Sequence, residues 1–167
     1  MKLVVQRVSR AAVRVDGKIV GAISRGLVVL AGIERGDGPE HVKRAAHRLA
    51  SLRVFEDEAG KMNRGLDEIG GEVLLVSQFT LAGSIRRGRR PDFVQAAPPQ
   101  EAEPLIVALA DALRARGVAV SSGVFRAHME VELVNDGPVT FIWDDPPERQ
   151  ETSDRGPGSE DNTAAEP

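Results

Sequence analysis

The pattern of hydrophobic and polar positions predicts strands at the start of the chain. Residues Lys2 to Val15 form a long strand-like run, and Asp16-Gly17 is a typical two-residue hairpin turn. Residues Lys18 to Ile23 fit the returning strand. The run 27–33 is apolar enough for a central strand that is buried on both faces. We therefore expect an N-terminal hairpin followed by a central strand.

Two later segments have the spacing of amphipathic helices. Pro39 suits a first helical turn, where a missing N–H costs little, and Asp37 or Gly38 can cap it. The apolar stripe of this helix consists of Val42, Ala45, Ala46, Leu49 and Leu52. A second helix is predicted from about Pro99 to Arg116, before the natural terminator Gly117. Its buried face would be formed by Leu105, Leu109, Ala112 and Leu113.

The remaining pattern again indicates strands. They are predicted at 53–55, 72–79, 118–120, 125–133 and 139–143. From Phe125 to Leu133, apolar residues alternate with Arg126, His128 and two glutamates, as on a half-buried strand. Because strands outnumber the two helices and do not alternate regularly with them, we predict an α+β domain. Its sheet would be mainly antiparallel and barrel-like or layered, with the two helices packed outside.

The charge divides the chain into two parts. Residues 146–167 hold six acidic residues, two arginines and four prolines, and none of Val, Leu, Ile, Met, Phe or Trp. Such a segment cannot offset the entropy of ordering, so we predict one folded domain at 1–145 and a disordered acidic tail at 146–167. The tail carries −4 of the total −3, which leaves the folded part at +1. The overall acidity is therefore weak evidence against a nucleic-acid partner.

Composition limits the chemistry further. There is no cysteine and no tyrosine, and the three histidines are scattered, so we expect no metal site and no thiol nucleophile. The usual phosphate-loop, dinucleotide and nucleophile-elbow motifs are missing, and we expect no cofactor. The N-terminal segment turns polar too soon for a signal peptide, and no apolar run is long enough for a membrane span. A cytoplasmic protein is the simplest interpretation.

Three segments remain as candidates for function. Ser77-Gln78-Phe79-Thr80 ends a predicted central strand, although the residues alone favour local closure of that strand as the role of its hydroxyls. Arg86, Arg87, Arg89 and Arg90 surround Gly88 and suit phosphate contacts, against a plain solvated loop. Gly137-Pro138 fits either a plain turn or an unusual backbone geometry.

Taken together, the chain resembles the D-aminoacyl-tRNA deacylase family over about residues 1–145. The segments that carry the resemblance are Val5-Gln6-Arg7-Val8, Asp16-Gly17, Phe55-Glu56-Asp57, Gly60-Lys61-Met62-Asn63, Ser77-Gln78-Phe79-Thr80-Leu81, Gly88-Arg89-Arg90-Pro91 and Asn135-Asp136-Gly137-Pro138-Val139-Thr140. The sequence departs from the family in its long tail and in Ala82-Gly83-Ser84, which replaces an aromatic-containing stretch.

The resemblance implies an enzyme that hydrolyses the ester between a D-amino acid, or mischarged glycine, and the terminal adenosine of tRNA. It also implies a homodimer with its sites at the subunit interface. Gly137-Pro138 would be cis and would select chirality in the partner's site. Arg7 would help to hold the dipeptide, Met129, Asn135 and Thr140 would be further supporting residues of the site, and the loop arginines would bind tRNA. Ser77, Gln78, Phe79 and Thr80 would form the catalytic segment.

For the chemistry, the family offers two accounts. Thr80 is the nucleophile in one, whereas in the other the terminal ribose 2′-hydroxyl assists water while backbone N–H groups near Phe79 and Thr80 polarise the ester. We favour the second, since the sequence places no histidine beside either hydroxyl. Two alternatives stay open: a non-catalytic RNA-binding module, and a small-molecule esterase that uses Ser77 or Thr80.

Overall fold

The structure is a computed structural model that describes residues 1–86 and 88–146. Apart from Pro146, the tail predicted at 146–167 lies outside the described residues, as does Arg87. The elements are β1 (Lys2–Val15), β2 (Lys18–Ile23), β3 (Gly26–Gly32), α1 (Pro39–Ala50), β4 (Phe55–Glu56), β5 (Met62–Arg64), β6 (Glu72–Ser77), the 3₁₀ helix η1 (Phe79–Ala82), α2 (Pro99–Arg114), β7 (Ala119–Ser122) and β8 (Glu130–Asp144).

The predicted N-terminal strands and both helices are confirmed. Strand β1 turns back into β2 through Asp16 and Gly17, whose φ angles of 49° and 74° fit a two-residue hairpin turn. Strand β1 is the centre of the sheet, because β3 and β2 pair with one edge of it and β8 pairs with the other, all antiparallel. Most residues of β1 are therefore held between two neighbouring strands.

Most strand pairs are antiparallel, as predicted, but the sheet is mixed because it also contains two parallel pairs. Strand β3 pairs with β6 in parallel, and β6 pairs with β7 in parallel. Each pair is joined through a helix, α1 in the first case and α2 in the second, as parallel pairing requires. The two β–α–β units are β3–α1–β6 and β6–α2–β7. Their regular order was hard to recognise in the sequence, because the other strands of the sheet pair antiparallel with β1.

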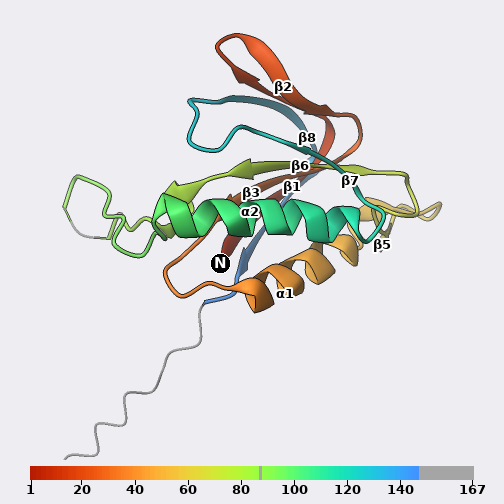
Figure 1. Cartoon of the computed structure of the whole chain (residues 1–167). Coiled ribbons are helices and arrows are strands. Elements are labelled where there is room, and N and C mark those ends of the chain that lie inside the picture. The colour runs from red at the N-terminus through yellow and green to blue at the C-terminus, as the bar shows by residue number, and fades with distance from the viewer. Residues whose placement is uncertain (87, 147–167) are drawn as a thin grey trace, which may run out of the picture.

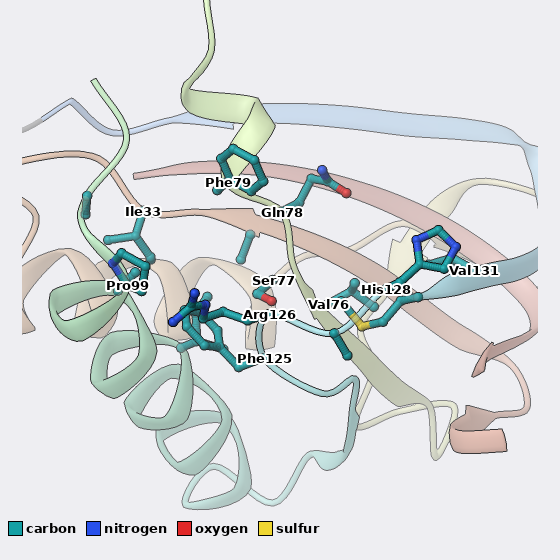
Figure 2. A pocket seen from close by; sticks show the side chains of 16 residues that line it. Ile33, Val76, Ser77, Gln78, Phe79, Pro99, Phe125, Arg126, His128 and Val131 are labelled. Atoms are coloured by element: carbon teal, nitrogen blue, oxygen red, sulfur yellow. The ribbon is translucent and has the colours of Figure 1, made fainter. Parts of the chain in front are cut away.

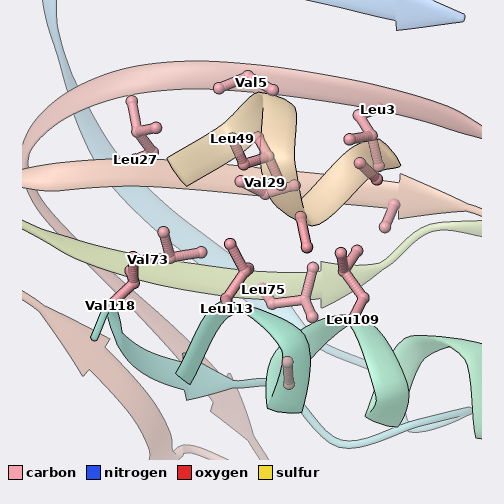
Figure 3. Close-up of a cluster of buried hydrophobic side chains, with 14 of the residues drawn as sticks. Leu3, Val5, Leu27, Val29, Leu49, Val73, Leu75, Leu109, Leu113 and Val118 are labelled. Carbon is pink, nitrogen blue, oxygen red and sulfur yellow. The ribbon is translucent and has the colours of Figure 1, made fainter. Parts of the chain in front are cut away.

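Both helices cover the same face of the sheet (Figure 1). Figure 3 shows Leu49 of α1 and Leu109 and Leu113 of α2 pointing toward side chains of β1, β3 and β6. This cluster forms the larger core, and Phe55 is its largest fully buried side chain. Over the described part of the chain, neither helix has the length and apolar character needed to cross a membrane.

The opposite face of the sheet curls toward a barrel. Strand β2 bends over to β7, where the Ser121 hydroxyl donates to the Ala22 carbonyl at 3.0 Å. The closed end encloses a second, smaller core that includes Val8, Val13 and Leu74. Toward the other end the curl opens, and Ile142 of β8 is 79% exposed there. The fold thus leaves one part of the sheet face uncovered within a single chain.

The last strand differs from its prediction in two ways. Residues 124–127 form a turn in which Arg126 has a φ of 62°, so the alternation from Phe125 does not begin a strand there. Strand β8 then continues through 135–138, where the sequence indicated a break. It does so by bulging, since Gln6 pairs with Thr140 and Val8 with Asn135. Four residues of β8 therefore lie opposite Arg7 alone.

Candidate active site

A pocket of about 560 Å³ opens where β3 and β6 end beside α2. This volume is in the range of small-molecule sites. The walls are mostly apolar, and Figure 2 shows the polar side chains of Ser77 and Gln78 among them. The other labelled residues of this view are Ile33, Val76, Phe79, Pro99, Phe125, Arg126, His128 and Val131. The predicted catalytic segment therefore lies at a mostly apolar pocket beside the sheet end.

The segment Ser77–Thr80 changes from strand to 3₁₀ helix at the pocket. The Gln78 N–H donates to the Ala31 carbonyl at 2.7 Å, and the Leu81 N–H donates to the Gln78 carbonyl at 3.2 Å. The Gln78 side-chain amide donates to the Thr80 hydroxyl at 2.5 Å. An amide cannot take up the hydroxyl proton, so this contact orients Thr80 without activating it as a nucleophile.

The sequence pattern missed the segment 125–129 as a wall of this pocket. Phe125, Arg126 and His128 all line it, together with Met129. His128 is exposed, as predicted, but it stands on a loop rather than on the polar face of a strand. In Figure 2 its ring lies apart from Ser77. Among the described residues, no histidine or carboxylate is hydrogen-bonded to Ser77 or Thr80.

The Gly137-Pro138 peptide is cis and is held in the bulge of β8. The buried Arg7 donates from Nε to the Asp136 carbonyl at 2.9 Å and from Nη1 to the Val54 carbonyl at 2.6 Å. Behind the dipeptide, the Asn135 side chain accepts the Val139 N–H at 2.8 Å and donates to the Val139 carbonyl at 3.1 Å. Gly137 and Pro138 themselves are exposed, although the bulge that carries them is held by these hydrogen bonds.

Thr140 adds to the hydrogen bonds of Arg7 and Asn135, and these three residues form a brace around the dipeptide. The Thr140 hydroxyl accepts from the Asn135 amide and from the Gln6 amide, each at 3.2 Å. The structure therefore brings together three of the four predicted supporting residues: Arg7, Asn135 and Thr140. Met129 lies elsewhere, in the pocket wall beside the catalytic segment.

Within one chain, the two predicted halves of the site lie apart. Arg7 pairs with Leu27, whereas Ser77 pairs with Ala31, four residues further along β3. Four strand residues span about 13 Å. Neither Gly137 nor Pro138 lines the pocket. A single chain thus presents an open pocket and, at a separate place, an exposed and braced loop.

The arginine loop extends from the sheet just after η1. Ser84 and Asp92 close it with two backbone hydrogen bonds, of 2.7 and 2.9 Å. Between them, Arg86, Arg89 and Arg90 are exposed, and Gly88 has a φ of 73°. Arg86 lines a hollow of about 670 Å³ together with Lys2. The loop can therefore present positive charge to a partner at the edge of the sheet.

Comparison with known proteins identifies relatives over nearly the whole described domain. The D-Tyr-tRNA(Tyr) deacylase family model matches residues 4–144. A D-aminoacyl-tRNA deacylase of Anaeromyxobacter dehalogenans is 58% identical over 144 residues, which are 86% of this chain and 97% of the relative. The protein of the same name from Thermomicrobium roseum is 56% identical, over 86% of this chain and 92% of its own length.

Solved structures show the same fold. One, described as the c-Myc DNA unwinding element binding protein, is 40% identical with a TM-score of 0.82 and covers 87% of this chain and 99% of its own. Another, a probable eukaryotic D-amino acid tRNA deacylase, has a TM-score of 0.74 at 21% identity, over 85% and 97% of the two chains. The sequence matches extend from β1 through the braced bulge of β8. The chain therefore belongs to the D-Tyr-tRNA(Tyr) deacylase family.

Proposed function

We propose that this protein hydrolyses the ester bond of D-aminoacyl-tRNA, and of tRNA mischarged with glycine, to release the free amino acid and tRNA. The observation that carries the proposal is the match to curated D-aminoacyl-tRNA deacylases over the entire domain, at 58% identity for one of them. A pocket of about 560 Å³ beside the Ser77–Thr80 segment supports it, since this space can hold the aminoacylated terminal nucleoside.

The chemistry that we propose relies on backbone groups. The N–H groups near Phe79 and Thr80 would polarise the ester carbonyl, while the 2′-hydroxyl of the terminal ribose assists the attacking water. The Gln78–Thr80 hydrogen bond supports this account, because it holds the Thr80 hydroxyl without supplying a base. Ser77 and Gln78 would position the substrate, and no cofactor takes part.

We propose that Gly137-Pro138 acts as the selector of chirality in the site of the partner subunit. Arg7 and Asn135 hold the flanking carbonyls of Asp136 and Val139, so the dipeptide between them makes a wall that cannot move aside without moving the chain. A D-residue would turn its side chain away from this wall, whereas an L-residue would drive its side chain into it. Glycine has no side chain to reject, so glycyl-tRNA would be hydrolysed as well.

This arrangement requires a homodimer, for which the open part of the sheet face is the natural contact. Trp143 packs against the core on the helix side, so its neighbour Ile142 points to the other face. Val4 lies opposite Ile142 in the register. A two-fold contact through this apolar face would carry the β8 bulge of each subunit toward the other. The pocket of each subunit would then be completed by the Gly137-Pro138 bulge of the partner subunit.

For tRNA itself, we propose that Arg86, Arg87, Arg89 and Arg90 contact phosphates. The described arginines of this loop are exposed, and the loop begins directly after the catalytic segment. Arginine forms bidentate bonds with phosphate and retains its charge, which suits this role. The reaction would take place in the cytoplasm, where charged tRNA is used.

Hydrolysis of D-aminoacyl-tRNA by the purified protein tests the proposal against its two alternatives. A protein that binds tRNA but releases no amino acid would be an RNA-binding module, a possibility that the DNA-binding name of one structural relative also raises. Covalent labelling by a serine-directed inhibitor would favour an esterase that uses Ser77 or Thr80. We expect ester hydrolysis, and no labelling.

Substitution of Thr80 tests the mechanism separately. Thr80→Ala should retain most of the turnover, because the backbone N–H groups stay in place. Complete loss of turnover in a variant that still folds and binds tRNA would instead make Thr80 the nucleophile.

A further inference from the structure

The rings of an aromatic pair stand exposed beside the pocket, and the proposed chemistry uses only the backbone of Phe79. The ring centroids of Phe79 and Phe93 lie 5.1 Å apart with an interplanar angle of 56°. Their residues are 59% and 38% exposed. The sequence has only five phenylalanines and one tryptophan, so two of its six large aromatic residues form this one solvent-facing contact. Burial in the core does not account for this pair.

The backbone holds Phe93 in a fixed place. The Phe93 carbonyl accepts the Ala96 N–H at 3.0 Å, and the next N–H, that of Val94, donates to the Asp92 carboxylate at 2.8 Å. The Arg35 side chain donates to the Val94 carbonyl at 2.9 Å. The first two bonds shape the segment, and the Arg35 bond ties it to the chain just after β3. The ring is therefore a positioned surface rather than a free side chain.

Glycine allows the ring to approach the neighbouring backbone. A Cβ at Gly83 would lie 2.7 Å from Phe93 Cε1 and 2.9 Å from its Cδ1, closer than real contacts permit. One edge of the ring thus rests against Gly83 while part of the ring stays open to solvent. The platform consists of Phe79, Gly83 and Phe93.

The platform connects two hollows of different character. Phe79 lines the apolar pocket next to Ser77. Asp92 and Val94, the neighbours of Phe93 in the chain, line the 670 Å³ hollow whose cations are Lys2 and Arg86. A strand that leaves the pocket along this route would meet first an aromatic surface and then positive charge. This is the combination that binds single-stranded nucleic acid.

We propose that the Phe79–Phe93 platform stacks the bases of the unpaired nucleotides that precede the terminal adenosine of tRNA. Their phosphates then lie toward Lys2 and Arg86. The inference rests on the proposed function, because it takes the terminal aminoacyl-adenosine to occupy the pocket. Stacking on an aromatic face tolerates any base sequence, so the platform serves all tRNAs alike.

The test compares Phe93→Leu with Phe93→Tyr on two substrates. Leucine keeps apolar bulk but has no aromatic face, whereas tyrosine keeps the ring. On D-aminoacyl-tRNA, Phe93→Leu should lower kcat/KM about tenfold, as expected when one base loses its stacking partner, and Phe93→Tyr should restore most of it. On D-aminoacyl-adenosine, which lacks the preceding nucleotides, the loss should be far smaller. Equal losses on both substrates, or none on either, would overturn the proposal.

A binding measurement tests the platform without catalysis. Uncharged tRNA with a complete 3′ end should bind the unchanged protein several-fold more tightly than tRNA that lacks its last three nucleotides. Phe93→Leu should reduce this difference to the part that the terminal adenosine contributes in the pocket, and an unchanged difference would refute stacking. If the unchanged protein binds in this way but hydrolyses no ester, the proposed function fails while the platform stands.

Two controls complete the design. Met62→Ala removes an apolar side chain that is 49% exposed on β5, and it should change neither affinity nor kcat/KM. Sedimentation of Phe93→Leu tests the other possible occupant of this surface, a second copy of the chain. A shift toward monomer in that variant would assign the pair to self-association and overturn the proposal.

Discussion

At the scale of single residues, Arg7 explains how the exposed Gly137-Pro138 loop is held. Its side chain is 4% exposed and donates to the carbonyls of Asp136 and Val54. Hydrogen bonds from a charged donor contribute more than neutral ones. The Asp136 carboxylate, at 3.3 Å from Nε, adds an ion pair. One buried guanidinium thus fixes both the bulge of β8 and the segment before β4.

Removal of this guanidinium should loosen the brace. We expect Arg7→Ala to lower the free energy of unfolding by about 3 kcal/mol, measured by urea denaturation. The free energy of unfolding of Arg7→Lys should lie between those of Arg7→Ala and the unchanged protein, because one ammonium group cannot reach both carbonyls. A variant Arg7→Ala that is as stable as the unchanged protein would contradict the assigned role.

Gly137 is needed in the loop for two reasons. Its φ is 142°, and a Cβ there would lie 2.8 Å from the Val139 nitrogen and 2.5 Å from Val139 Cγ2. Gly17 also has a positive φ but has nothing within 4 Å of such a Cβ. Gly17→Ala should therefore cost about 1–2 kcal/mol from backbone strain alone. Gly137→Ala should cost about 1–3 kcal/mol more from overpacking. Equal losses in thermal or urea unfolding would argue against the crowding.

Residue chemistry alone did not predict this arrangement. The cis peptide and the support from Arg7 were expected through the family resemblance, since Gly-Pro by itself also fits a plain turn. Met129 was expected as a supporting residue of the site, and it lines the pocket rather than the Gly137-Pro138 bulge. A side chain reaches its neighbours through the three-dimensional path of the chain, which spacing in the sequence does not contain.

At the scale of elements, the β4–β5 hairpin supports the segment that Arg7 contacts. Asp57 closes its turn, accepting backbone N–H groups of Ala59 and Lys61 at 2.9 and 3.0 Å and the Asn63 amide at 2.6 Å. The hydrogen bond from the Lys61 backbone, followed by that from Asn63, holds the pKa of Asp57 below its ordinary value. The ionised carboxylate is therefore the form that stabilises this turn.

The sign of the pH effect follows from that shift. Because the folded pKa is depressed, the stabilisation is present above the ordinary aspartate pKa of about 3.9 and is lost as pH falls through the lower folded value. The turn amides should lose protection from hydrogen exchange over this acidic range. In Asp57→Asn the same amides should show no such pH dependence, and an identical acid response in both proteins would contradict the assignment.

The sequence predicted elements well where one local signal dominated. Asp16-Gly17 and Pro39 placed a turn and a helix start correctly, because backbone angles and missing donors act locally. Parallel pairing of β3, β6 and β7 was missed, since partners depend on how crossovers fold back over the sheet. The alternation from Phe125 also misled, because a turn with one positive φ interrupts it.

At the scale of the whole molecule, the account depends on two subunits completing each site. Ile142→Lys tests the open sheet face, since a lysine is tolerated at a position that is 79% exposed in one chain but not in an apolar contact. We expect the unchanged protein to sediment as a dimer and Ile142→Lys to weaken it at least roughly tenfold, a change of about 1.4 kcal/mol.

The matched control for this experiment lies on the helical side. Val107 of α2 is 54% exposed, and Val107→Lys should leave the dimer intact. Hydrolysis should fall with the fraction of dimer in Ile142→Lys. A monomeric unchanged protein with full activity would rule out a shared site.

The central claim is selection by chirality, and hydrolysis of one tRNA charged with either enantiomer of the same amino acid tests it most directly. Glycyl-tRNA measured alongside shows whether a substrate without a side chain is admitted. We predict that the D-aminoacyl and glycyl esters are hydrolysed and that the L-aminoacyl ester reacts more slowly by roughly a hundredfold or more. Equal rates for the two enantiomers would contradict the account.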